Sequence, residues 1–362
     1  MSARPDVDRM RSRLRELVEL ETPTGGTAGL AEAYELLSTW LDPLLGAPGI
    51  ERIDGVEHRC WRGSASPRML LLGHLDTVWP VGTIDRRPFT VTGDRVTGPG
   101  TFDMKAGLVI VAEALLLAER RDVAVLVTSD EEVGSITSRP IIEREAAAAG
   151  AVLVIEPSLD GALKSARRGG GIYRIEFHGR GAHAGLEPER GRNALTELAR
   201  HVLELPRAAD QHLGTTVSPT VATAGTVTNV IPERAELHVD VRAWSLAELE
   251  RVHERIAELQ PYDEDVRIRV IGGINRPPME PERSRELLEL ASAVAEARQL
   301  PLVEAVAVGG ASDGNFTAAL GIPTLDGLGP DGGGAHAEDE WVSLRSMTER
   351  AELVAGIVDG WR

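Results

Sequence analysis

Short, unbroken apolar runs alternate with segments of helical periodicity in the first half of the chain, and this alternation limits the fold more than any other feature. The apolar runs, each predicted to be a buried strand, are residues 69–72, 123–127 and 151–155. Helical spacing marks residues 106–117 and 140–149, and earlier residues 5–20 and a second helix ending near 45. Strands buried on both faces and separated by helices form largely parallel sheets. The sequence therefore predicts an α/β fold with a mostly parallel mixed sheet and flanking helices.

The middle of the chain has a different pattern. Tyr173, Ile175 and Phe177 alternate with polar residues, which indicates a strand with one solvated face. The elements expected after it are a helix at 193–205, strands at 220–227 and 235–243, a helix at 246–259 and a strand at 266–271. The order βαββαβ is that of the ferredoxin-like unit. The glycines at 169–171 and 272–273 are interpreted as hinges on either side of it.

The α/β pattern resumes near residue 281, with helices expected at 284–298 and 313–320, a strand near 306 and a last helix ending near 361. We therefore expect a discontinuous α/β domain, residues 1–168 and 275–362, interrupted by an inserted α+β domain, residues 169–274.

Composition excludes several classes of protein. The 362 residues carry a net charge of −17, which makes nucleic acid an unfavourable partner. The single cysteine, Cys60, allows neither an intrachain disulfide nor a thiolate zinc site. The first fifteen residues are polar and charged, and no apolar run is long enough for a membrane span. A cytoplasmic protein without a membrane partner is the expectation.

Acidic and imidazole side chains follow the predicted strands, at the sheet edge where open α/β folds bind ligands. In chain order these residues are His74, Asp76, Asp103, Glu131, Glu132, Glu156 and His336. Gathered at one edge, they would repel one another or stay unpaired unless a cation joined them. A divalent metal is the simplest explanation.

Each of these residues also has an ordinary explanation. A lone aspartate often caps a helix, and a pair of glutamates usually lies on a solvated surface. The remaining histidines lack a surrounding carboxylate cluster or glycine-rich loop and are assigned structural roles: His58, His178, His201, His212, His238 and His253. The joint occurrence at successive strand ends is what favours a metal site.

Taken together, these motifs resemble the co-catalytic dizinc aminoacylase/carboxypeptidase family, the M20-type metallopeptidases. The resemblance covers nearly the whole chain, and the motifs around residues 309–313 and 332–336 are most similar to the carboxypeptidase G branch. Within the insert, the family's lid and dimerisation domain is matched by residues 179–185, 192–195, 229–232 and 240–242.

The resemblance implies a role for each strand-end residue. One zinc would be held by His74, Asp103 and Glu156, and the other by Asp103, Glu132 and His336. Nitrogen and oxygen ligands suit zinc and would also accept cobalt or manganese. Two metals roughly 3.5–4 Å apart can share one water and lower its pKa.

The general base of the reaction would be Glu131, which must point away from its neighbour Glu132, as consecutive residues of an extended segment do. Asp76 would orient the imidazole of His74. The family also has a cis peptide bond after the bridging aspartate, so Asp103–Met104 is expected to be cis.

The insert would supply contacts to the substrate. By resemblance, Arg242 would clamp the substrate's terminal carboxylate, and His183 with Asn229 would donate to the tetrahedral oxyanion. Arg276 would contribute to recognition of an acidic side chain such as glutamate. The insert would pair two subunits in a homodimer, with His183 reaching the partner's active site.

Three hypotheses for function follow. The first is a dizinc amidohydrolase that cleaves a C-terminal amino acid, glutamate among them, from a small peptide or N-acyl amino acid. The second is an N-acyl-amino-acid deacylase of a metabolite, acting through the same site. The third is a non-catalytic binding protein on the same fold, which predicts that a ligand or the base is missing, and none is missing here.

Overall fold

The computed structural model describes residues 4–362 and divides them into two compact units. The first unit, here called the catalytic unit, consists of the chain up to Ala166 with residues 281–308 and 312–362. The second, here called the insert, consists of residues 167–280 with 309–311. The sequence placed the corresponding boundaries after 168 and after 274.

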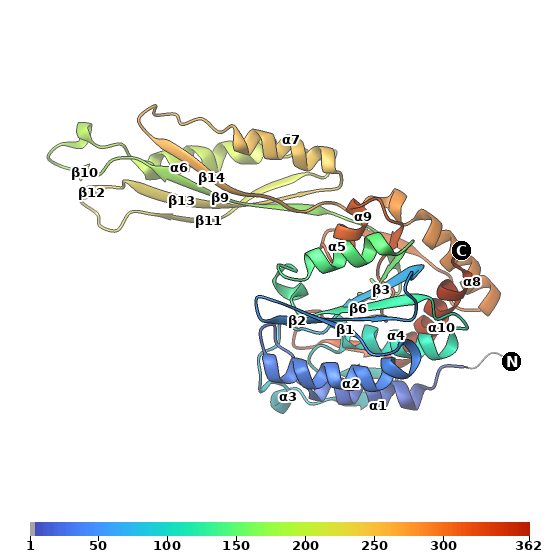
Figure 1. Ribbon diagram of the computed structural model, residues 1–362. Helices are drawn as coiled ribbons and strands as arrows, with labels where there is room; N and C mark the ends of the chain where they lie inside the picture. Colours follow the sequence, from blue (N-terminus) through green and yellow to red (C-terminus); the bar gives the residue numbers. More distant parts are fainter. Residues whose placement is uncertain (1–3) are drawn as a thin grey trace. The chain divides into compact units, whose positions relative to one another are not determined.

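A six-stranded mixed sheet forms the centre of the catalytic unit (Figure 1), in the order β1-β2-β6-β3-β7-β16. Strands β6, β3, β7 and β16 run parallel, whereas the hairpin β1–β2 is antiparallel and extends one edge. The strands are β1 (Gly49–Ile53), β2 (Val56–Arg62), β3 (Met69–His74), β6 (Val123–Thr128), β7 (Val152–Val154) and β16 (Thr324–Leu325). The predicted fold class is confirmed, although β1 and β2 were not predicted from the sequence.

Helices cover both faces of this sheet (Figure 1). They are α1 (Val7–Glu19), α2 (Thr27–Leu45), α3 (Thr83–Arg86), α4 (Ala106–Leu117), α5 (Arg139–Ala148), α8 (Arg285–Arg298), α9 (Gly314–Ala319) and α10 (Leu344–Gly360). Successive residues of a strand point to opposite faces. Leu71 of β3 accordingly joins the core with α1, α2, α4, α8 and α10, while Leu70 and Leu72 join the core with α5 and α9.

Two smaller sheets complete the catalytic unit. An antiparallel sheet has the order β17-β18-β5-β4, and β8 pairs with β15. Their bounds are β4 (Thr90–Thr92), β5 (Arg95–Thr97), β8 (Leu163–Arg167), β15 (Ala305–Val308), β17 (Gly332–Gly333) and β18 (Trp341–Ser343). The connection between β17 and β18 carries His336, so this sheet positions a predicted metal ligand.

The insert is a four-stranded antiparallel sheet, β11-β13-β9-β14, with two helices packed on it. Its main elements are β9 (Gly169–His178), α6 (Ala194–Glu204), β11 (Thr216–Ala224), β13 (Arg234–Ala243), α7 (Leu246–Ala257) and β14 (Arg267–Arg276). Tyr173, Ile175 and Phe177 of β9, which alternate with polar residues in the sequence, do lie in its core, and alternate residues of β13 join them. A short pair of strands, β10 (Ala182–His183) and β12 (Val230–Ile231), lies beyond this sheet.

The hinge interpretation of the glycines was wrong. Gly169–Gly171 begin β9, and Gly272 and Gly273 lie inside β14. A Cβ at Gly170 would lie 3.0 Å from Nη1 of Arg242, its partner on β13, so the glycine leaves room for that guanidinium.

Side-chain caps fix where several helices begin. Asp6, Asn193, Ser245 and Ser343 each accept a hydrogen bond from a backbone N–H in the first turn of α1, α6, α7 and α10. None of the helices in residues 4–362 has the length and apolar character needed to cross a membrane.

The hydroxyl of Tyr34 joins α2 to the end of β6 inside the core. Its ring is fully buried, and its oxygen lies 2.9 Å from the Val127 carbonyl and 2.6 Å from Ser129 Oγ. This contact stabilises the strand end that leads to Glu131.

We expect Tyr34→Phe to lower the free energy of unfolding by about 1–2 kcal/mol, because it removes a buried hydroxyl together with its hydrogen bonds. Urea denaturation measures the change. Tyr262→Phe is the matched control, because that residue is 51% exposed. Equal stability of the two variants would contradict the role assigned to the Tyr34 hydroxyl.

Candidate active site

Five chain segments bring the predicted metal ligands together, three of them at the carboxyl ends of parallel strands and a fourth between β17 and β18, where His336 lies. His74 is the last residue of β3, and Glu156 follows β7 by two residues. Asp103 lies in an irregular turn, Thr101–Lys105, that leads into α4. Glu132 follows β6 in a short helical turn, Glu131–Val133. The side chains that the sequence placed at one edge of the sheet do meet there.

Two groups of potential metal ligands result. The first is His74, Asp103 and Glu156, and the second is Asp103, Glu132 and His336; within each group the ligand atoms lie within 4.8 Å of one another. Oδ1 of Asp103 is 3.2 Å from Nε2 of His74, and Oδ2 is 3.4 Å from Nε2 of His336. Asp103 is therefore common to both groups, with one oxygen directed to each.

The electrostatics of these groups suit a cation. Burial raises the pKa of Glu132 to about 8, with the charge of Asp103 adding to the effect. A hydrogen bond to Asp103 raises the pKa of His336 to about 9. Burial alone would lower the pKa of His74, but its bonds to Asp103 and Asp76 outweigh it and raise that pKa well above the usual value. Carboxylates packed this closely favour positive charge on the imidazoles, and a bound metal would supply that charge instead.

A further observation fits a metal. Oε1 of Glu132 is buried, and no hydrogen-bond donor among residues 4–362 reaches it. A buried carboxylate oxygen without a partner costs free energy. Coordination of a metal would remove that cost, so the residues present fit a dinuclear site.

Asp76 supports both sides of the site. It is fully buried, and its carboxylate accepts hydrogen bonds from the backbone N–H groups of Glu131 and Glu132, each at 3.2 Å. Its backbone oxygen lies 3.0 Å from Nδ1 of His74, and its Oδ1 lies 3.5 Å from the same nitrogen. One residue therefore orients the imidazole and fixes the turn that carries the two glutamates.

The side chains of Glu131 and Glu132 were expected to point in different directions because the segment was expected to be extended, and this reason was wrong. Residues 131–133 form a tight helical turn rather than an extended segment. Successive side chains of such a turn point about 120° apart, because it has about three residues per turn. Glu132 lies 3.0 Å from His336, and Glu131 belongs to neither ligand group.

The peptide bond between Asp103 and Met104 is cis, as expected.

Sequence reasoning missed Glu340, which is fully buried. Its Oε1 accepts hydrogen bonds from the backbone N–H groups of Phe102 and Asp103, at 2.8 and 3.1 Å. Its Oε2 accepts from Gly100 N and Trp79 Nε1, both at 2.9 Å. Glu340 therefore holds the turn that presents Asp103. No sequence signal distinguishes it from its exposed neighbours Glu338 and Asp339.

Sequence reasoning also missed Lys105, two residues after Asp103. Its side chain is buried, its Nζ donates to the Leu20 carbonyl at 2.8 Å, and burial lowers its pKa to about 7. The opposite charge of Glu340 acts against that shift.

The predicted substrate residues of the insert lie in two places. His183 and Asn229 are exposed neighbours, because the Ala184 N–H donates to the Asn229 carbonyl at 2.9 Å. Arg242 is paired with Asp240 through Nε and Nη2, at 2.9 and 2.8 Å. Arg276 ends β14 and is only 7% exposed.

Comparison with known proteins agrees with this arrangement. Residues 70–360 match Peptidase family M20/M25/M40. The chain is 32% identical to carboxypeptidase G2 of Pseudomonas sp. (strain RS-16), across 95% of this chain and 87% of that protein. It is 28% identical to succinyl-diaminopimelate desuccinylase of Thioalkalivibrio sulfidiphilus (strain HL-EbGR7), across 95% of this chain and 96% of that protein. The crystal structure of aminopeptidase PepT from Bacillus cereus ATCC 10987 has the same fold, with a TM-score of 0.78 and 21% identity across 98% of both chains.

A mixed α/β sheet with two carboxylate–imidazole groups at its carboxyl edge is suited to bind two metal ions. The chain belongs to the M20/M25/M40 peptidase family, and it is a hydrolase of that family. The hypothesis of a non-catalytic binding protein is therefore dropped.

We expect Glu340→Gln to destabilise the protein by about 2–5 kcal/mol. The carboxylate accepts four hydrogen bonds, and the amide NH₂ of glutamine would face two of those donors without being able to accept from them. Metal affinity should fall roughly tenfold to a hundredfold as the Asp103 turn loosens. Urea denaturation and competition with a chelator measure the two effects. Glu338→Gln changes the same charge at an exposed site of the same loop, and matching behaviour of the two variants would refute the role of Glu340.

Proposed function

We propose that the chain is an amidohydrolase of the carboxypeptidase type, which releases a C-terminal amino acid, glutamate among them, from a small peptide or N-acyl amino acid. The observation that carries the proposal is the pair of ligand groups sharing Asp103, with Glu131 preceding the ligand Glu132 in the chain. The identity to carboxypeptidase G2 supports this substrate class.

Two zinc ions, or cobalt or manganese in their place, would supply a water of lowered pKa and polarise the scissile carbonyl. His74, Asp103 and Glu156 would hold one ion, and Asp103, Glu132 and His336 the other. Glu131 takes a proton from the attacking water and delivers it to the leaving nitrogen. Asp76 keeps this base in place through its bond to the Glu131 N–H.

His183 is suited to donate to the oxyanion of the tetrahedral intermediate. The Gly185 N–H donates to Nδ1 of His183 at 3.2 Å. A neutral imidazole that accepts at Nδ1 carries its proton on Nε2. The exposed ring therefore presents an N–H to a substrate, and Asn229 beside it would add its side-chain amide.

Arg242 is suited to bind the terminal carboxylate of the substrate. Asp240 engages Nε and Nη2 and so fixes the plane of the guanidinium. Its remaining N–H groups are the ones that would meet a carboxylate. Arg276 remains the predicted contact for an acidic side chain, although its burial leaves little of it for a substrate to reach.

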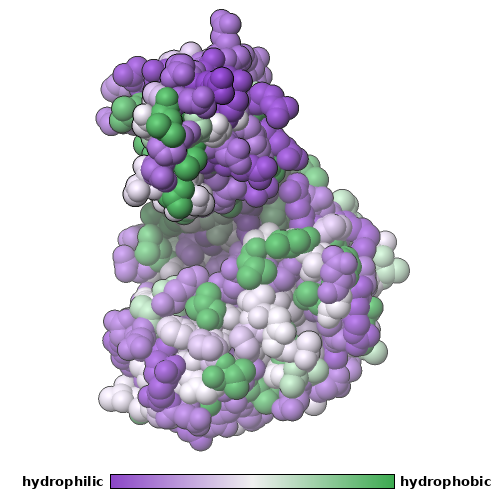
Figure 2. Space-filling model, turned by 90° about the vertical axis from the view of Figure 1, so that its left-hand side faces the viewer, coloured by the Kyte–Doolittle hydropathy of each residue, from purple (hydrophilic) through white to green (hydrophobic). Residues whose placement is uncertain are grey.

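A homodimer through the insert would bring His183 to the partner's site. The insert exposes several large apolar residues near β10 and β12, among them Leu186 (76% exposed), Val227 (56%) and Val230 (41%). Figure 2, which faces the side where β10 and β12 lie, shows green side chains gathered on this unit. Exposed apolar surface of this kind favours association with another protein surface.

A deacylase is the second candidate function, because the chain is also 28% identical to a succinyl-diaminopimelate desuccinylase over nearly its whole length. An assay of amine release over a panel of dipeptides and N-acyl amino acids, with zinc or cobalt present, separates the two. Rates that depend mainly on which C-terminal amino acid is released, across different acyl or peptidyl groups, support the carboxypeptidase. Rates that depend mainly on the acyl group, whichever amino acid is released, would favour the deacylase.

Glu131→Gln should retain the bound metal yet lose at least about a hundredfold in kcat, the usual contribution of a positioned base. Glu132→Gln should instead weaken one metal, because it removes a ligand. Metal analysis and steady-state kinetics on both variants test this pair. An active Glu131 variant would show that the two roles were assigned wrongly.

Arg242→Ala should raise KM steeply for substrates with a free terminal carboxylate and much less for their amides, because only the former lose a charge-assisted bond. Paired kinetics on a substrate and its amide give the answer. An equal rise in KM for the substrate and for its amide would show that Arg242 does not bind the carboxylate and is a surface residue that pairs with Asp240.

Mixed dimers test whether His183 acts on the partner. His183→Ala and Glu131→Ala subunits should each be inactive alone, but a heterodimer would have one site in which both residues are intact. Random mixing gives half heterodimers, so activity should recover to about a quarter of wild type. If heterodimers form and no activity returns, His183 acts within its own chain or not at all.

A further inference from the structure

A cavity of about 240 Å³ lies in the catalytic unit beside α8 and α10, and none of the predicted metal ligands lines it. It is bounded by the turn at Gly161, the segment Leu300–Val303 that follows α8, Asp331 before β17, and the first half of α10. Pockets that hold drug-sized ligands usually have about 300–1,000 Å³. This cavity is therefore suited to a smaller molecule.

Arg350 of α10 places a buried positive charge in the cavity. The residue is 8% exposed, and its Nη2 donates to the Gly161 carbonyl. No carboxylate within residues 4–362 forms an ion pair with it. Burial lowers the pKa of Arg350 to about 10, which shows how poorly its charge is solvated. A buried guanidinium with one neutral partner is costly unless an anion joins it.

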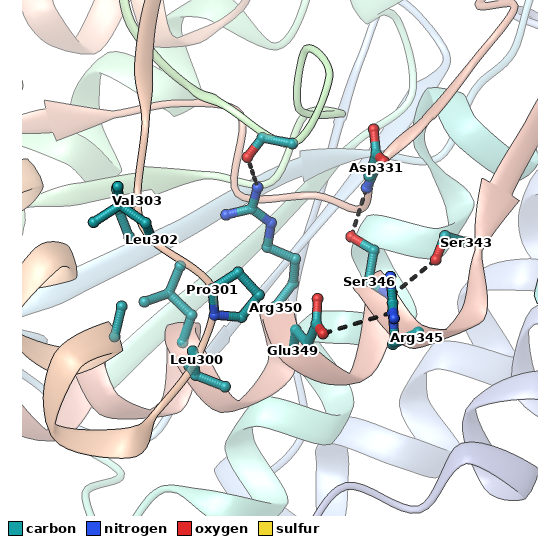
Figure 3. A pocket seen from close by; sticks show the side chains of 13 residues that line it. Leu300, Pro301, Leu302, Val303, Asp331, Ser343, Arg345, Ser346, Glu349 and Arg350 are labelled. Atoms are coloured by element: carbon teal, nitrogen blue, oxygen red, sulfur yellow. Dashed lines mark hydrogen bonds and ion pairs between the residues drawn. The ribbon is translucent and has the colours of Figure 1, made fainter.

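Two carboxylates on the same cavity lie near Arg350 without reaching it. Asp331 accepts a hydrogen bond from the Gly332 N–H at 2.9 Å. Oε1 of Glu349 lies 3.8 Å from Nε of Arg345, an ion pair drawn as a dashed line in Figure 3. Both are close enough for their charge to act on the pKa of Arg350. The cavity thus offers one site for an anion and another for a cation.

The opposite wall is aliphatic. Figure 3 shows Leu300, Pro301, Leu302 and Val303 on one side of Arg350, with Asp331 and Glu349 on the other. A ligand that satisfied all three surfaces would carry a negative group, a positive group and an apolar chain. A ligand with only a carboxylate would have no positive group to face Asp331 and Glu349. A ligand with only an amine would place its positive charge beside that of Arg350.

We propose that this cavity binds a free α-amino acid with an aliphatic side chain. Its carboxylate would lie on Arg350, its ammonium group would face Asp331 and Glu349, and its side chain would pack on the wall formed by Leu300–Val303. Guanidinium groups bind carboxylates through two parallel hydrogen bonds, which suits the first of these contacts. The proposal does not depend on which amide bond the enzyme cleaves.

Calorimetric titration of the full-length, metal-loaded protein with leucine tests the proposal. Leucine should bind at least about tenfold more tightly than leucinamide, which lacks the carboxylate, and than 4-methylpentanoate, which lacks the ammonium group. Glycine, which has no side chain, should also bind more weakly. No leucine binding up to about 10 mM, or equal binding of either analogue, would overturn the proposal.

Variants locate the bound leucine. Arg350→Met keeps the apolar stem of the side chain and should weaken leucine binding at least about tenfold. Val303→Trp should abolish it by filling the cavity from a residue that is only half-buried, and it decides the matter if Arg350→Met does not fold. Leu320→Trp, at a leucine outside the cavity that is 47% exposed, is the matched control and should bind normally.

The substrate site is a competing location for leucine, because Arg242 is proposed to bind a carboxylate there. Arg242→Ala should leave leucine affinity unchanged if the cavity at Arg350 is the binding site. Loss of binding in Arg242→Ala, with binding retained in Arg350→Met and Val303→Trp, would place leucine in the substrate site and refute the proposal.

Discussion

The carboxylate of Asp103 lies between two imidazoles, 3.2 Å from Nε2 of His74 and 3.4 Å from Nε2 of His336. His336 comes from a segment more than two hundred residues beyond His74 and Asp103 in the chain. Only the parallel sheet and the hairpin β17–β18 bring them together. Because hydrogen bonds from both imidazoles outweigh burial, the pKa of Asp103 lies below its usual value, so the residue remains an anion. A single anionic group can then serve two metal ions.

Two other buried carboxylates keep this arrangement in place by accepting hydrogen bonds from main-chain N–H groups. Asp76 holds the turn that carries Glu131 and Glu132, and Glu340 holds the turn that carries Asp103. Neither belongs to a ligand group. Loops bearing several functional groups are otherwise mobile, so such outer contacts decide how well the ligands are oriented.

Much of the fold was predictable because the signals are local. The apolar runs of β3, β6 and β7 are buried on both faces, and the alternation in β9 and β13 follows the single core of the insert. The strand-end residues His74, Glu132 and Glu156 could be placed together for the same reason, since parallel strands end at one edge.

Other features depend on contacts that the sequence does not reveal. The glycines at the start of β9 were interpreted as a hinge. In the structure, Gly170 instead leaves room for the side chain of Arg242, its partner on β13. Glu340 lies in an acidic segment whose other members are exposed, and only the folded hairpin brings it to the Asp103 turn. Arg350 resembles any arginine of an amphipathic helix until the turn at Gly161 covers it.

The central claim is that Asp103 joins two metal sites. Anomalous diffraction at the zinc absorption edge, from crystals of protein purified without chelator and supplied with zinc, tests it most directly. The account predicts two peaks per chain, one beside His74 and Glu156 and one beside Glu132 and His336, with the Asp103 carboxylate between them. A single peak, or none at these side chains, would contradict it.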